Sequence, residues 1–408
     1  MNLQLGNRKT LKNRLFYFFP ILFSFCLPFG TLFLSHIIII WCLFSLINIK
    51  IQELKRGLLN KNLQLCFLFF IITLISALMS NNKIESLFSI EIKLSFIIIP
   101  YLVFCFRWPI ELIKKCFVSF VTGCLSACIY IIFRAIIYKY NNHSEYFFYS
   151  LFSKFLHTAY FSMYLLLAIS IIIIYFNNWF NSQKNIIYSS YIFILIFSIC
   201  IILCASKIGI ISFFITIIIL FYYKFKTILS IKNIAIFIIS LSLIVISINK
   251  LLPNSFDRFN SLTNIFSKNQ DKKTSESTAV RLLIWEESII LIKNNFILGT
   301  GVGDANDELY KRYNSNGLEG AYSSKLNAHN QFLQTFIGIG FLGFLSLFLI
   351  SIGQIFIAYN KKDILKIVFF IIISLNFLVE SMLQTSAGVL FFVFFYCLIN
   401  KSKINLND

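Results

Sequence analysis

The chain has 408 residues, of which 58% are hydrophobic and 13% are charged, and its mean hydropathy is +0.80. A soluble protein of this size could not bury that much apolar surface, so the composition excludes a soluble protein and predicts an all-α polytopic membrane protein. The net charge of +19 does not indicate nucleic-acid binding, because the basic residues form short clusters between apolar runs and no basic–aromatic stripe.

Twelve apolar windows near the length of a membrane span follow one another along the chain. They cover about residues 15–30, 32–49, 63–80, 87–105, 112–136, 156–176, 187–204, 207–223, 233–249, 330–358, 364–380 and 385–399. The first window follows four basic residues, as a signal peptide does, but no small-residue cleavage site follows it. We therefore interpret it as a retained span.

The distribution of lysine and arginine predicts which side each loop faces. Basic clusters occupy alternate connections, whereas the short loops between them carry Lys83, Lys207 and few other cations. Because basic loops stay in the cytoplasm, both termini are predicted inside. The predicted organisation is nine spans within 1–249, a long external loop at 250–328, and three spans with a short cytoplasmic tail within 329–408.

The external loop carries nine of the seventeen carboxylates and one strongly patterned segment, "STAVRLLIWEESIILIKNN". Apolar residues recur there at helical spacing, at Leu282, Trp285, Ile289, Ile292 and Phe296. The segment is too short and too charged to span a membrane. It predicts an amphipathic helix over 278–295 that lies on the outer membrane surface, with Trp285 at headgroup depth.

A glycine-rich stretch, "FILGTGVGDANDELY", follows that helix. Gly299, Gly301 and Gly303 do not indicate a dinucleotide site, because their spacing is wrong and no βαβ unit surrounds them. The sequence "DANDE" is similar to the start of a calcium loop, but Leu309 stands where glycine is required. A tight turn is the preferred interpretation and calcium the alternative. The ten cysteines lie in or beside apolar runs without histidine or carboxylate company, which is typical of packing residues.

Two residues at the outer surface carry potential chemistry. His329, in "NAHN" at the entry to the tenth span, either caps the helix or acts on a substrate. Arg281 lies in the first turn of the external helix, where a cation is unfavourable beside the positive end of the helix dipole. It therefore either has a functional role or contacts a lipid headgroup.

The spacing of these residues resembles a known family. His329-Asn330, nine residues and then Gly340-x-x-Gly343 is similar to the H-[NSQ]-x9-G-x-x-[GTY] pattern of the O-antigen ligase and polymerase superfamily. The upstream "RLLIWEESIILIKNNFILGTGVGD" resembles that family's R-x-x-x-W helix and glycine turn. Members are multi-span proteins of the bacterial inner membrane with a large external loop between late spans.

The resemblance implies a glycosyltransferase that acts on the periplasmic face of that membrane. Such enzymes move a glycan from a polyprenyl (undecaprenyl) diphosphate carrier to an acceptor hydroxyl, for example on the lipid A core, without a cofactor or metal. His329 is expected to take the acceptor proton, and Arg281 and Lys207 to bind the diphosphate. Family members more often have a Ser-Arg pair at Lys207, whose lysine lacks the guanidinium fork. Supporting roles are expected for Asn330, Gly301, Gly303, Glu380 and Trp285.

Several further ionisable residues have open interpretations. Lys93 and Glu91 lie within a span and either mark function or snorkel outward as an interfacial pair. Glu380 either orients His329 or is solvated, with the second slightly favoured. His157 and Arg134 are weaker candidates, and His36 and His143 are interpreted as interface residues.

Three other functions remain open. A branch of the same family passes glycan to protein hydroxyls, and the motifs that the branches share cannot separate it from a ligase. A polymerase of the same family would extend a growing glycan instead of capping a core, although the His-Asn form of the motif leans toward a ligase. A lipid-linked sugar transporter also fits twelve spans, but it predicts internal repeats and charges near the bilayer midplane, which the sequence hardly offers.

Overall fold

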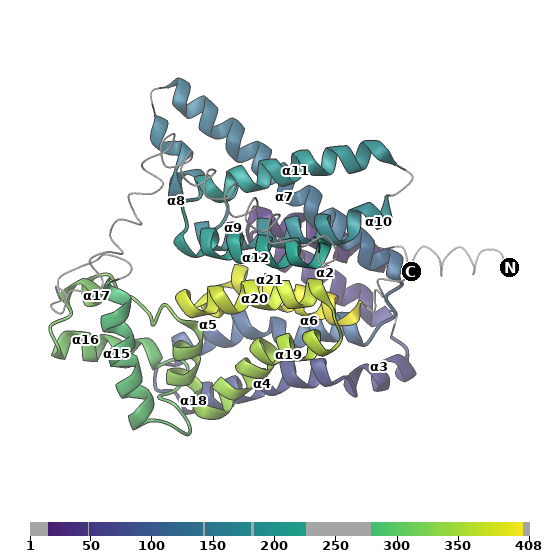
Figure 1. Ribbon diagram of the computed structural model, residues 1–408. Coiled ribbons are helices and arrows are strands. Elements are labelled where there is room, and N and C mark those ends of the chain that lie inside the picture. The colour runs from purple at the N-terminus through teal and green to yellow at the C-terminus, as the bar shows by residue number, and fades with distance from the viewer. Residues whose placement is uncertain (1–14, 48, 142, 181–182, 226–278, 403–408) are drawn as a thin grey trace.

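The computed structural model describes residues 15–47, 49–141, 143–180, 183–225 and 279–402, and the regular elements among them are all helices (Figure 1). Seven of these helices are long and apolar enough to cross a membrane: Lys61–Met79, Lys83–Phe104, Ile110–Tyr140, Thr158–Phe176, Lys184–Leu203, Lys207–Lys224 and Gln331–Asn360. Four shorter apolar helices accompany them: Leu15–Phe29, Leu34–Ile47, Ile364–Val379 and Ser386–Lys401. Every predicted window coincides with one of these helices except 233–249, which lies outside the described residues.

The individual elements have the following bounds. In the first half they are η1 (Leu27–Phe29), α2 (Leu34–Ile47), α3 (Ile51–Leu58), α4 (Lys61–Met79), α5 (Lys83–Lys93), α6 (Ser95–Phe104), α7 (Ile110–Tyr140), η2 (Ser144–Phe147), α8 (Tyr149–Phe152), α9 (Thr158–Ile171), η3 (Ile172–Phe176), α10 (Asn177–Trp179), α11 (Lys184–Leu203) and α12 (Lys207–Phe225). In the second half they are α15 (Ala279–Asn294), α16 (Ala305–Ser315), α17 (Glu319–Ser323), α18 (Gln331–Ile350), α19 (Ile352–Asn360), α20 (Ile364–Val379), η5 (Met382–Gln384) and α21 (Ser386–Lys401).

The helices α9 and α21 form the centre of the bundle. Every residue of α9 is buried, as are the twelve residues from Gly388 to Ile399 of α21. A helix that is apolar on all sides has to be surrounded by other helices or by lipid, and α9 contacts α7, α11, α12 and α20. Stacked rings link the two central helices, with Tyr164 and Phe391 at 4.0 Å between ring centroids.

Helices α9 and α12 begin at the end of the bundle where α20 finishes. Gly209, near the start of α12, lies directly beside Ser162 in the first turns of α9. Tyr223, at the far end of α12, lies within electrostatic range of Asp363, the N-cap of α20. This arrangement brings Lys207, His157 and Glu380 to one end of the bundle, each at a helix terminus.

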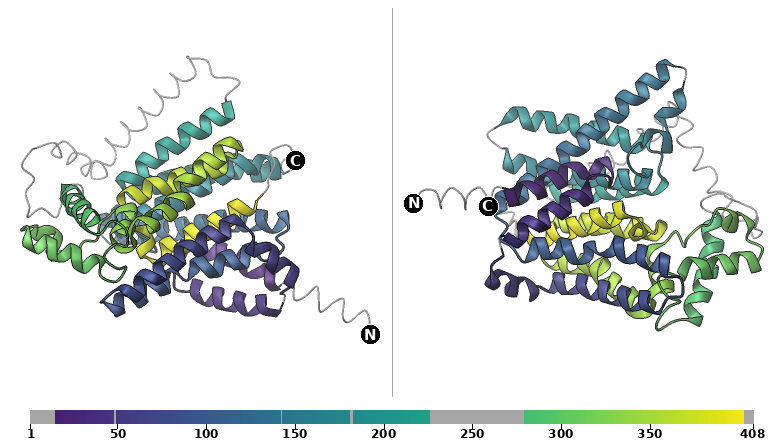
Figure 2. Two further views of the ribbon diagram at one scale, coloured as in Figure 1. Left: turned by 90° about the horizontal axis from the view of Figure 1, so that it is seen from below. Right: turned by 180° about the vertical axis from the view of Figure 1, so that it is seen from behind.

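A small helical lobe is attached at that same end. It consists of α15, α16 and α17, at the left of Figure 1, while α3 lies at the opposite end of the bundle, and the views of Figure 2 agree. The lobe has its own core, formed by residues that include Val280, Ile284, Leu309 and Tyr313. The predicted helix over 278–295 is present as α15, whereas α16 and α17 were not predicted.

The faces of α15 differ from the predicted arrangement. Its buried positions are Val280, Ile284, Ser288, Leu291 and Ile292, which pack into the lobe. Of the predicted apolar stripe only Ile292 belongs to this buried face. The helix α15 therefore has two hydrophobic faces. One face packs into the lobe, and the other stays exposed and includes Ile289, with Phe296 just after the helix.

Candidate active site

The site begins with a break in α18 at Gly340, where the backbone has φ +67° and ψ −165°. A break of this kind leaves helix carbonyls and amides without partners inside the helix. The glycine turn supplies the missing partners. The amides of Thr300 and Gly301 donate to the carbonyls of Ile337 and Gly338, at 2.7 and 3.1 Å. Phe341 in return donates its amide to the Phe296 carbonyl at 3.0 Å.

Gly340, the first glycine of the Gly340-x-x-Gly343 motif, is therefore the point where the glycine turn crosses α18. A Cβ atom on Gly340 would lie 2.2 Å from the carbonyl oxygen of Ile297, so only glycine allows the turn to cross α18 there. Gly301 has φ +103° and packs against Ser80 at the end of α4, and Gly303 packs against Ser86 of α5. The predicted tight turn is confirmed, and its glycines lie against α4, α5 and α18.

Asp304 fastens this turn to the bundle. Its two carboxylate oxygens each accept a backbone amide, from Asn81 and from Asn82, both at 2.7 Å. The side chain of Asn82 in turn donates to Asp307 at 2.8 Å. The described residues contain no cluster of three or more histidine, cysteine or carboxylate side chains suited to a metal, and Asp304 is occupied by these amides. The alternative of a calcium loop at 304–308 finds no support in this geometry.

The entry to α18 is held by a network of side-chain amides. Asn330 is its N-cap, and its side-chain oxygen accepts the amides of Phe332 and Leu333 at 2.9 and 3.1 Å. Gln334 accepts the Ala328 amide at 2.9 Å. Trp285 of α15 donates its indole N–H to the Ala328 carbonyl at 3.0 Å, which ties the lobe helix to the residue before His329.

His329 itself has an unusual backbone conformation, with φ +42°. Its amide donates to the Asn327 side chain at 2.9 Å, which helps to hold this conformation in place. A left-handed conformation at a non-glycine residue costs free energy, on the order of 1 kcal/mol, and persists only where the surrounding structure fixes it. The side chain of His329 is thereby presented at the mouth of the helix bundle.

Glu380 joins His329 to Arg281. One carboxylate oxygen of Glu380 accepts from the Arg281 guanidinium at 2.9 Å, and the other lies 3.5 Å from Nδ1 of His329. The three side chains are only 18% (Arg281), 13% (Glu380) and 26% (His329) exposed. The alternative of a solvated Glu380 is therefore wrong, because this carboxylate is largely buried between the Arg281 guanidinium and the His329 ring.

The charge state of Glu380 follows from these partners. Burial works to raise the pKa of the Glu380 carboxyl, but the His329 ring, the Arg281 guanidinium and the charge of His157 outweigh it. The pKa of Glu380 is lowered below its ordinary value of 4.5, so the side chain is a carboxylate at neutral pH. His157, a weak candidate from sequence alone, thus belongs to the surroundings of this site; its place at the start of α9 was the only signal that could have indicated it.

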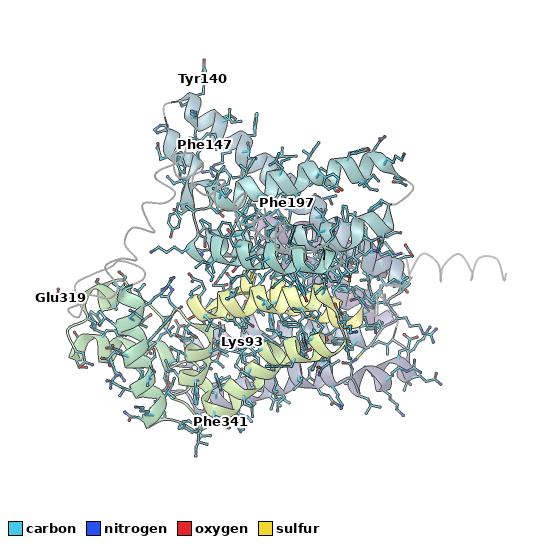
Figure 3. The ribbon with its side chains drawn as sticks, viewed as in Figure 1. Lys93, Tyr140, Phe147, Phe197, Glu319 and Phe341 are labelled. Carbon is cyan, nitrogen blue, oxygen red and sulfur yellow. The ribbon has the colours of Figure 1, made fainter. Side chains whose placement is uncertain are left out.

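The remaining candidates lie elsewhere. Lys207 is half-buried at the start of α12, at the same end of the bundle as Glu380. Lys93 is only 3% exposed and lies among the packed spans (Figure 3). Glu91 is exposed. The interpretation of both as an outward-snorkelling pair is therefore wrong. The ammonium of Lys93 has no hydrogen-bond partner among the described residues.

This arrangement can support proton transfer next to a bound anion. With Nδ1 of His329 turned to a carboxylate, the other ring nitrogen, Nε2, makes no hydrogen bond to a described residue and can accept a proton. Nε of Arg281 likewise has no hydrogen-bond partner among the described residues. Fixed cations and an imidazole at one end of a helix bundle suit a phosphate-bearing substrate.

The fold defines a multi-pass membrane protein with a helical lobe docked on one end of its bundle. In a comparison with known families, residues 192–348 match the family model described as O-antigen ligase (Wzy_C). The segment that carries the predicted motifs is thus similar to the O-antigen ligase family of enzymes. The matched segment is less than half of the chain and includes Lys207, Arg281 and His329, but not Glu380. No curated protein matches the chain.

Proposed function

We propose that the protein transfers a glycan from a polyprenyl diphosphate carrier to an acceptor hydroxyl, as a ligase that acts on the lipid A core. The family places the reaction among glycan transfers of the ligase or polymerase type, on lipid-linked substrates. The observation that carries the proposal is the buried Arg281–Glu380–His329 cluster, because it combines a fixed cation with an oriented imidazole.

In this mechanism His329 acts as the general base. Glu380 lies 3.5 Å from Nδ1 and faces the ring, and Nε2 accepts the proton of the acceptor hydroxyl while the hydroxyl oxygen attacks the anomeric carbon of the donor. The bond between that carbon and the diphosphate oxygen breaks, and the lipid diphosphate departs with the electron pair. Arg281 and Lys207 stabilise the charge on the leaving diphosphate, and the N-termini of α9 and α12 add their dipoles at the same end.

We further propose twelve spans with both termini in the cytoplasm and the lobe in the periplasm. The last residues of α12 and the first residues of α15 lie at opposite ends of the bundle, and a topology of twelve spans includes one crossing between these two helices. The apolar window at 233–249 is the predicted place for that crossing. The exposed apolar face of α15, with Ile289, Phe296 and Ile297, would then contact the outer membrane interface.

The test is the surface glycan profile of the host, compared on gels between wild type, a deletion strain and His329→Ala. A ligase predicts that His329→Ala matches the deletion, loses polymer from the lipid A core and accumulates carrier-linked glycan. Chains that stop at a single repeat would assign the protein as a polymerase instead. A normally inserted and expressed His329→Ala protein that gives the wild-type profile would refute the catalytic assignment and favour transport.

A further inference from the structure

A polar cavity lies at the opposite end of the bundle from His329. It has a volume of about 610 Å³ and is formed where α4 and α20 begin and where α19 and α21 end. Cavities of this size accommodate small ligands or lipid headgroups. The catalytic proposal uses none of its residues.

The lining of this cavity is strongly cationic. Four lysines contribute to it, namely Lys61, Lys361, Lys362 and Lys366, against the single carboxylate Asp363. Asp363 is engaged as the N-cap of α20, since its side chain accepts the Lys366 amide at 3.1 Å. The lining therefore carries an excess of positive charge that nothing in the described part of the chain neutralises by an ion pair.

Two of the lining side chains are deeply buried, so the cavity is more than a group of surface lysines. Lys366 is 6% exposed, and its ammonium donates to the Asn400 side chain at 2.6 Å. Gln354 is 1% exposed, and its side-chain oxygen has no partner among the described residues. Its amide nitrogen makes one long contact, 3.4 Å to the Leu349 carbonyl, so the amide can turn either end to a ligand. Unsatisfied buried polar groups carry a free-energy cost that a ligand would remove.

Part of the remaining wall is apolar, next to the polar side chains of Asn62, Asn400 and Ser402. Ile174, Ile357, Ile364 and Leu365 line the cavity beside the lysines. Lysine ammonium groups bind phosphate as point charges, and apolar walls at the inner ends of spans suit the glycerol and first methylenes of a lipid. We propose that this cavity binds the phosphate headgroup of an anionic lipid of the inner leaflet. The inner position rests on the proposed orientation, whereas binding of the anion does not.

The experiment uses the purified full-length protein reconstituted in nanodiscs of phosphatidylcholine with or without phosphatidylglycerol. The variant Lys61→Gln/Lys361→Gln removes two exposed lysines of the rim and should fold normally. Its control, Lys55→Gln/Lys224→Gln, removes two exposed lysines that do not line the cavity. Retention of phosphatidylglycerol by the detergent-extracted protein is measured by native mass spectrometry.

The expected result is that wild type and control retain phosphatidylglycerol, while the rim variant loses at least about tenfold in apparent affinity. Lys366→Met, which removes the buried cation but keeps an apolar stem, should weaken retention in the same direction. Inorganic phosphate is added as a competitor. If it displaces phosphatidylglycerol from wild type and control and stabilises only these two proteins, the anion site is confirmed and is assigned to a soluble phosphate. Equal retention by wild type, rim variant and control would overturn the proposal.

Discussion

At the scale of single residues, the decisive contact is the one that Glu380 makes with Arg281 and His329. Substitution of Glu380 by glutamine keeps the shape of the side chain but removes the charge that both partners face. We expect a loss of roughly 10²-fold in the rate constant of transfer, because the histidine loses the group that orients its ring. Steady-state transfer from a polyprenyl diphosphate donor measures this, and an unchanged rate would exclude Glu380 as a positioning residue.

The same substitution has a defined effect on stability. Glu380→Gln leaves a mostly buried guanidinium without its charge partner, at a cost of roughly 1–3 kcal/mol in the free energy of unfolding. Because folding lowers the pKa of Glu380 below 4.5, the ionised group stabilises the protein above that pH. The stability difference between wild type and variant should therefore be constant at neutral pH and shrink as the pH falls below 4.5.

Melting curves of the detergent-solubilised proteins over this pH range test that statement. Glu287→Gln is a matched control, since Glu287 pairs with Arg312 at 2.6 Å in the same lobe and has no place in the proposed mechanism. The control should lose stability without losing activity. A stability difference for Glu380→Gln that grows toward low pH would contradict the assigned charge state.

Arg281 offers a separate test of diphosphate binding. Arg281→Lys keeps a positive charge but loses the planar fork, so we expect transfer to fall by roughly 10- to 100-fold in kcat/KM. Arg281→Gln should fall further. Arg312→Lys changes the same residue type in the same lobe and should stay within about twofold of wild type. If Arg281→Lys retained full activity, bidentate contact with the diphosphate would be excluded.

At the scale of elements, the close crossing of the glycine turn and α18 explains why the motif contains Gly340. Gly340→Ala combines a strained φ of +67° with a Cβ only 2.2 Å from the Ile297 carbonyl, so the turn has to move. Gly317 has a similar φ of +69° but no atom within 4 Å of its would-be Cβ. The pair therefore separates backbone strain from steric exclusion.

We expect Gly317→Ala to cost about 1 kcal/mol of stability and Gly340→Ala roughly 3 kcal/mol or more. Limited proteolysis should in addition cut Gly340→Ala near the glycine turn, because the lobe loses its hydrogen bonds to Ile337 and Gly338. Equal melting temperatures for the two variants would show that the crossing of turn and helix tolerates a side chain.

The helices also show which features of the fold the sequence could predict and which it could not. Long apolar windows predicted the positions of the described spans, because hydropathy depends on local composition alone. The interruptions at Leu94, Gly340 and Ser351 were not predicted. The break at Gly340 depends on the glycine turn that crosses the helix there, which local composition does not report. His329 and Arg281 were found from a local motif. The burial of Glu380 was not, because its partner Arg281 lies 99 residues away in the chain.

At the scale of the whole molecule, the direction of the bundle in the membrane decides which leaflet supplies the substrate. The lobe and α3 lie at opposite ends, so single cysteines at Lys311 and Lys55, both exposed, report on opposite sides (Figure 1). The native cysteines are buried or half-buried, which keeps their background labelling low. A membrane-impermeant maleimide then distinguishes the two sides in cells whose outer membrane has been made permeable.

We expect Lys311→Cys to be labelled in such cells and Lys55→Cys only after the inner membrane is also broken. Lys224→Cys, at the end of α12, should behave like Lys55→Cys, because the proposed topology puts the end of α12 on the cytoplasmic side. Labelling of Lys224→Cys together with Lys311→Cys would remove the span at 233–249 from the topology. The reverse pattern for Lys311 and Lys55 would put the Arg281–Glu380–His329 cluster in the cytoplasm, where a periplasmic donor glycan cannot reach it.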